Sequence, residues 1–412
     1  MSPSAPVAPT LLLAGAALLL PAQEQPKTPV FVGGTKLVLV DFVVTGKGEA
    51  MVGGLSASDF VVKEDGKIRP IVSFVAFGGG ALPLGAGPAE VVVEAFPQAA
   101  APVPQGPGAI TVLLVDDGQM SPMQAVRLRP ALKTLINTIA ERSGALALIA
   151  PWSKITLAQE VEGNRALFAA AVDKIIGRRV EDRSTFPVSD AEAIAVQRGD
   201  RSMADRLVAR FVALNPGFDP DQAAALVASR TVEVARDAKI RREDLYGVML
   251  NSLDWLAKQP GRHSVVMVSG GFAYDSDDST RQEEVVTRSL RANAPIHFLD
   301  VRGLAGLGRF QGVEYGPALD RDAGETPFAF SEAAEGSSNM AADTGGLTIR
   351  NTNDMTKGLT RLLDMTTTYY ILGYEPPDHK KRGFRKIKVD VLPKGLHVLA
   401  RRGYFDEASD PR

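Results

Sequence analysis

The chain of 412 residues has no cysteine, only four histidines and no long block of charge of one sign. The absence of cysteine excludes disulfides, thiolate metal sites and cysteine nucleophiles. The net charge of −2 argues against a nucleic-acid-binding protein, which would present a basic face. Apolar runs long enough to cross a membrane are also missing. The length and the 45% of hydrophobic residues predict two or three domains with ample core.

A short apolar run, LLLAGAALLL, occupies Leu11–Leu20. Its length is typical of the hydrophobic region of a secretory signal peptide and is too short to span a bilayer. No lysine or arginine precedes the run, and Leu20 is larger than the residues that usually precede a cleavage site. We expect residues 1–23 to be a signal peptide and the protein to be exported, whether periplasmic, envelope-associated or secreted. The alternative is a disordered N-terminus or one that begins at a wrongly assigned start. No membrane span is expected after signal removal.

Both ends of the remaining chain have the pattern of β-strands. Residues 29–77 are rich in Val and Leu and contain Asp65-Gly66, a strong hairpin signal after which Ile71–Phe77 is expected to be the returning strand. Residues 367–405 contain FRKIKVDV, in which every second position is apolar. We expect the two end segments to pair as a small β-sandwich-like domain, and residues 78–109, rich in Gly, Pro and Ala, to be a linker.

Residues 110–366 alternate apolar strands with amphipathic helices. This alternation predicts an α/β domain with a doubly wound, mainly parallel sheet of Rossmann type. Residues 181–258 contain no clear strand and predict a helical insertion, with one helix starting at Asp219-Pro220. The predicted strands are 110–115, 145–150, 264–269 and 296–301.

Several segments resemble one family. They read VVTGKGEAMVGGLSASDFVVKEDGK at 43–67, PGRHSVVMVSGGF at 260–272 and IHFLDVRGL at 296–304, followed by AADTGGLTIRNTNDMTKGL, YYILGYEPP and LHVLARRGYF. Together they resemble von Willebrand factor A (VWFA)-related proteins of Acidobacteria and their neighbours. The resemblance implies a von Willebrand A-like α/β domain in an exported bacterial protein.

The strand at 110–115 ends in Asp116 and Asp117, at the edge of the sheet where ligands of open α/β folds bind. The resemblance implies a metal motif here: Asp-x-Ser-x-Ser after the first strand, a Thr from a second loop and an Asp after a later strand. Carboxylates and hydroxyls of this kind suit Mg²⁺. Aligning Asp116 with the first Asp places Gly118 and Met120 at the two Ser positions.

The other expected ligands are also replaced. Ser269 stands where the later strand would carry its Asp, and Ser184 or Thr185 would have to supply the second-loop hydroxyl. If the motif is aligned one residue later, its three positions fall on Asp117, Gln119 and Ser121, whose side chains offer some oxygen ligands. We therefore expect a degenerate metal site that needs no cofactor, with Mg²⁺ or a similar ion as the weaker alternative. Its candidate ligands are Asp116, Asp117, Ser121 and Ser269.

The two aspartates have a simpler interpretation, in which they cap the positive N-terminus of the following helix.

The four histidines lie at no metal-ligand or triad spacing, so no catalytic constellation is evident. We therefore expect a non-catalytic module that binds an unidentified protein partner and no nucleic acid. The alternative is a metal-dependent hydrolase that uses Asp116, Asp117 and Ser269. The candidate partner-binding residues are Asp116, Asp117, Gln119 and Thr185.

Overall fold

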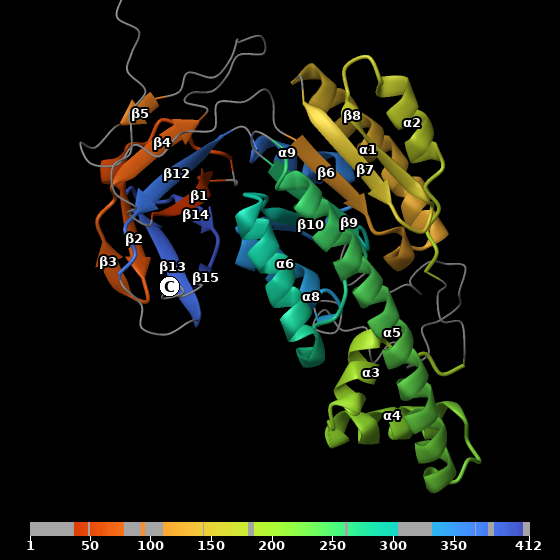
Figure 1. Cartoon of the computed structure of the whole chain (residues 1–412). Helices are drawn as coiled ribbons and strands as arrows, with labels where there is room; N and C mark the ends of the chain where they lie inside the picture. Colours follow the sequence, from red (N-terminus) through yellow and green to blue (C-terminus); the bar gives the residue numbers. More distant parts are fainter. Residues whose placement is uncertain are drawn as a thin grey trace, which may run out of the picture. The chain divides into compact units, whose positions relative to one another are not determined.

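A six-stranded sheet of order β11-β10-β9-β6-β7-β8 is the centre of the α/β region in this computed structural model. All neighbouring pairs in it are parallel except β7–β8. Its strands are β6 (Ile110–Val115), β7 (Ala145–Ala150), β8 (Ile155–Glu160), β9 (His263–Ser269), β10 (Ile296–Asp300) and β11 (Thr348–Ile349). The α/β class is confirmed, and the sheet is compatible with a Rossmann-like fold (Figure 1). The structure describes residues 37–47, 50–77, 92–94, 110–142, 144–179, 185–259, 263–303, 332–366, 368–377 and 383–406.

Two layers of helices cover this sheet, and the side chains of β6 alternate between them. Leu113 and Val115 enter the core shared with α1 (Pro122–Glu141), α2 (Arg165–Asp173) and α9 (Met355–Asp364). Val112 and Leu114 enter the core shared with α5 (Pro220–Leu256), α6 (Ser279–Arg291) and α8 (Glu335–Thr344). Burial of both faces explains why β6 is a continuous apolar run.

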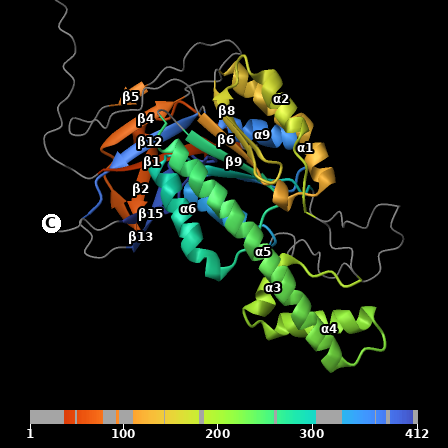
Figure 2. The same ribbon diagram turned by 45° about the vertical axis from the view of Figure 1, so that its right-hand side comes forward.

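The helical insertion is present as α3 (Asp190–Gln197), α4 (Arg201–Leu214) and the N-terminal half of α5. Figures 1 and 2 show α3 and α4 beside this half of α5, away from the sheet. As predicted, Pro220 is the first helical residue, and the side chain of Asp219 accepts a hydrogen bond from Asp221 N at 2.9 Å. The insertion has a small core of its own, formed by Phe186, Val188, Ala193, Leu207 and Val227.

A buried arginine on α5 joins this helix to the loop after β9. Arg242 is 1% exposed and forms ion pairs with Asp275 at 2.7 Å and with Asp278 at 2.5 Å. Arg198, which follows α3, pairs with the other oxygen of Asp275. The buried charges therefore hold the insertion against the carboxyl end of β9.

Strands from the two chain ends pair in two antiparallel sheets, β14-β1-β12-β4-β5 and β15-β13-β2-β3. Val40 lies opposite Leu372, and Val62 lies opposite Val389. The strands are β1 (Val38–Thr45), β2 (Phe60–Glu64), β3 (Lys67–Arg69), β4 (Ser73–Phe77), β5 (Val92–Glu94), β12 (Tyr369–Tyr374), β13 (Gly383–Val391), β14 (His397–Ala400) and β15 (Gly403–Asp406).

The hairpin expected at Asp65-Gly66 is present, with both residues at positive φ (47° and 80°), as a tight two-residue turn requires. Its returning strand is β3, however, and not Ile71–Phe77 as predicted. Those residues contribute β4 to the other sheet, where β4 pairs with β12.

The predicted signal peptide 1–23 lies outside the described residues, as does the linker 78–109 apart from β5. Among the described residues, no helix combines the length and the apolar character needed to cross a membrane.

We predict that Arg242→Ala lowers the free energy of unfolding by about 3–5 kcal/mol, because it leaves the buried carboxylate of Asp278 without its cation and that of Asp275 with Arg198 alone. Arg236→Ala is the control on the same helix. The side chain of Arg236 is 70% exposed, so its loss should cost less than about 0.5 kcal/mol. Urea unfolding followed by circular dichroism measures both, and equal effects would contradict a buried ionic link.

Candidate functional site

Three polar residues end neighbouring parallel strands: Asp116 follows β6, Ser269 ends β9 and Asp300 ends β10. The register pairs Asp300 with Ser269 and Val115 with Val268, which places Asp116 beside Ser269. All three are buried. Residues in register on parallel strands share a face, so the sheet brings these side chains into one row at its carboxyl edge.

The Ser269 hydroxyl donates to Asp116 Oδ2 at 2.7 Å and accepts from Gly271 N at 2.9 Å. Burial raises the pKa of Asp116 to about 6, against the lowering effect of the Ser269 hydrogen bond. The nearby Asp117 carboxylate raises the pKa further, whereas Arg179 lowers it. Burial therefore favours the protonated form of Asp116 up to a higher pH than for an exposed aspartate.

Asp300 is a residue of this row that the sequence analysis did not select. Arg302 neutralises its charge, with Nη2 at 2.5 Å from Oδ2, and Arg302 N donates to Oδ1 at 2.9 Å. The sequence does indicate this residue, because IHFLD, like the segment at 110–116, is a mainly apolar strand followed or ended by an aspartate.

Asp117 has a different role from Asp116, because hydrogen bonds to backbone amides engage both its carboxylate oxygens. Trp152 N donates to Oδ1 at 3.1 Å, and Ser153 N donates to Oδ2 at 2.7 Å. The carbonyl of Asp117 accepts from Arg178 N at 2.8 Å. One buried residue thus joins the end of β6 to the β7–β8 turn and to the segment after α2.

The positions aligned with the motif hydroxyls are closed to a ligand side chain. A Cβ at Gly118 would lie 2.4 Å from the indole Nε1 of Trp152. The Met120 side chain is fully buried in the core with α1. A serine at 118 would require the half-exposed Trp152 indole to shift, and residue 120 is part of the hydrophobic core.

The remaining candidates are also placed by the structure. Ser121 is the N-cap of α1, and its hydroxyl accepts from Gln124 N at 3.3 Å. Ser121, and not the aspartates, therefore caps this helix, which corrects the capping interpretation. Gln119 is buried, with Oε1 accepting from Arg179 at 3.3 Å. Thr185 is exposed, and no hydrogen bond found among the described residues links it to Asp116.

These residues do not fit a divalent cation. Asp116 is held by Ser269, the oxygens of Asp117 are taken by backbone amides, and Ser121 caps α1. Within the part of the chain that the structure describes, no three His, Cys, Asp or Glu residues are grouped to hold a metal. In the described arrangement, a Mg²⁺ ion would have to compete with these internal hydrogen bonds for its oxygen ligands.

Exposed apolar side chains surround this strand end. Trp152 is 45% exposed, Ile176 51% and Met123 61%. Ser153 Oγ accepts from Ile176 N at 3.0 Å, so the segments that carry Trp152 and Ile176 lie side by side. We call Met123, Trp152 and Ile176 the apolar rim. Its exposure depends on which segments meet at the edge, which the sequence pattern does not reveal.

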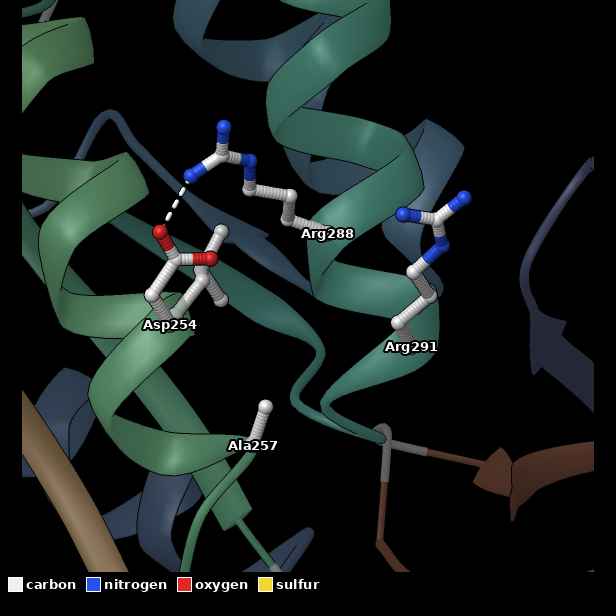
Figure 3. A pocket seen from close by; sticks show the side chains of 5 residues that line it. Asp254, Ala257, Arg288 and Arg291 are labelled. Atoms are coloured by element: carbon white, nitrogen blue, oxygen red, sulfur yellow. Dashed lines mark hydrogen bonds and ion pairs between the residues drawn. The ribbon is translucent and has the colours of Figure 1, made fainter.

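A cavity of about 320 Å³ lies between α5 and α6, lined by Leu253, Asp254, Ala257, Arg288 and Arg291 (Figure 3). Arg288 forms ion pairs with Asp254 and with Glu284, so its charge is compensated locally. The cavity lies where α5 and α6 end, just before β9 and β10 begin, which is the edge opposite to the polar row. It is therefore separate from the strand-end site.

No protein-family model matches this chain, and no curated protein matches it either.

We predict that Asp116→Asn becomes more favourable for stability as the pH rises. The pKa of Asp116 in the folded state lies above its ordinary value of 3.8. As the pH rises above 3.8, the unfolded chain therefore loses this proton more readily than the folded protein, which lowers the stability of the wild type. The neutral Asn side chain does not ionise, so the variant does not lose this stability. We compare the free energies of unfolding of the two proteins. The value for the wild type minus the value for the variant should fall by about 2–3 kcal/mol between pH 4 and pH 7. Denaturant unfolding across this pH range measures it, and a flat difference would contradict the raised pKa.

We predict that Gly118→Ser destabilises the fold by about 1–3 kcal/mol, because its Cβ would overlap the Trp152 indole. Trp152→Ala in the same chain should remove most of this cost. A double-mutant cycle of thermal or urea unfolding gives the coupling energy. Additive effects would show that the two side chains do not compete for space.

Proposed function

We propose that this chain is an exported, non-catalytic protein-binding module of von Willebrand A type with a degenerate metal motif. In this proposal the partner binds at the carboxyl edge of the sheet without a metal ion. Support for the von Willebrand A type comes from an acidic pair after the first strand of a mostly parallel sheet and from the segments that resemble the family. Support for export comes from the apolar run at Leu11–Leu20.

The observation that carries the proposal is the exposed Trp152 at the strand end. Large aromatic side chains in protein interfaces bury much area at low entropic cost, and tryptophan is enriched among binding hot spots. Asp117 fixes the backbone of Trp152, and the indole lies against Gly118, so one side of this side chain contacts the end of β6 and the rest is exposed. Ile176 and Met123 extend the apolar rim around it.

The hydrolase alternative has one observation in its favour, the 2.7 Å hydrogen bond from the Ser269 hydroxyl to Asp116. A nucleophile must also be able to reach the substrate. It further needs a general base nearby to take its proton, and a third group that orients this base. Ser269 is fully buried, and both oxygens of Asp117 already accept a hydrogen bond from a backbone amide. The protein-binding proposal is therefore preferred.

The proposal predicts metal-independent capture of a defined partner from envelope extracts. Trp152→Ala should abolish capture, and EDTA should leave it unchanged. Leu226→Ala is the matched control, because Leu226 is an apolar residue on α5 with a similar exposed fraction of 47%. Circular dichroism checks that both variants are folded. Capture that needs Mg²⁺, or that both variants lose equally, would contradict a metal-free interface at the strand end.

A further inference from the structure

Positively charged residues alternate with the apolar rim along the chain. Lys154 follows Trp152 by two residues, Arg178 follows Ile176 by two, and both are exposed. The hydrogen bonds of Asp117 to Ser153 N and Arg178 N place the backbones of both segments against the end of β6. Asp117 therefore holds the backbone of Trp152 close to the two backbone segments that carry Lys154 and Arg178.

The charges of Lys154 and Arg178 are available for a ligand. Among the residues that the structure describes, no carboxylate forms an ion pair with either side chain. Arg127 on α1 and Lys174 after α2 are also exposed in the two elements that flank the rim. Two exposed positive charges without a carboxylate partner, on the segments that carry the apolar rim, favour an anionic partner by electrostatic complementarity.

We propose that the apolar rim binds an acidic peptide segment of a partner protein, with Lys154 and Arg178 taking the place of a metal ion. A guanidinium pairs with a carboxylate through two parallel hydrogen bonds, and an ammonium adds a point charge beside it. An apolar side chain of the same segment packs on Trp152. This inference rests on the proposed function and specifies its partner by chemistry.

An anionic membrane is the less favoured occupant. Attraction to anionic lipid uses larger clusters of basic residues on one surface. Here the cations are few, and they flank a single indole whose inner side rests against Gly118. The exposed Asp173 and Glu160 belong to the same region of the chain and oppose a uniformly positive surface. A peptide with carboxylates at defined positions matches this arrangement better.

The test uses the full chain and fluorescence anisotropy of labelled synthetic peptides. One peptide is built from Asp and Glu with two Phe residues, and its control replaces every Asp by Asn and every Glu by Gln. The acidic peptide should bind and the amide peptide should not, and added salt should weaken binding. Arg178→Glu and Lys154→Glu should each raise the Kd about tenfold or more. Arg236→Glu, the same charge reversal at an exposed site on α5, should leave it unchanged.

Three results would overturn the inference: equal binding of both peptides, unchanged affinity after Arg178→Glu and Lys154→Glu, or binding to phosphatidylglycerol vesicles without binding to the acidic peptide. The proposed function fails separately. If Trp152→Ala abolishes partner capture but the two charge reversals do not alter it, the interface stands and its acidic occupant is wrong. If Trp152→Ala leaves capture unchanged, the interface itself lies elsewhere.

Discussion

The strand-end surface depends on one buried carboxylate, that of Asp117. An ionised group away from water is tolerated only when hydrogen bonds replace its hydration, and Asp117 obtains them from the amides of Trp152 and Ser153. Its carbonyl adds a third bond, to Arg178 N. Satisfying this residue therefore forces the β7–β8 turn and the segment after α2 to meet at the end of β6. The arrangement of the apolar rim is a consequence of that constraint.

The same interactions oppose the binding of a metal ion at this edge. Coordination by Asp117 would require it to release two amides, and a hydroxyl at 118 would require the indole of Trp152 to move. Asp116 is held by Ser269, and the charge of Asp300 is compensated by Arg302. The carboxylates at this edge are thus engaged by groups of the chain itself, and Trp152, Ile176 and Met123 are exposed around them. The further link between Arg242, Asp275 and Asp278 holds the helical insertion beside this edge.

Much of the fold could be predicted from local pattern. The runs at β6, β7, β9 and β10 are continuously apolar because helices cover both faces of the sheet, and such runs are easy to find. β8 was missed because it is an edge strand with mostly exposed or half-buried residues and carries no such run. The turn at Asp65-Gly66 was found, but its partner strand was misassigned. Which strand pairs with which is decided by long-range contacts, since β3 and β4 join different sheets.

The sequence by itself determined the α/β class, the acidic end of β6 and the absence of hydroxyls at Gly118 and Met120, because each is a property of residue type and local order. Only the tertiary structure decided what the remaining groups do. Asp116 and Ser269 are far apart in the chain and meet only when β6 and β9 pair, and the exposure of Trp152 depends on which segments pack around it. Burial and hydrogen bonding are set by spatial neighbours, and those neighbours come from distant parts of the chain.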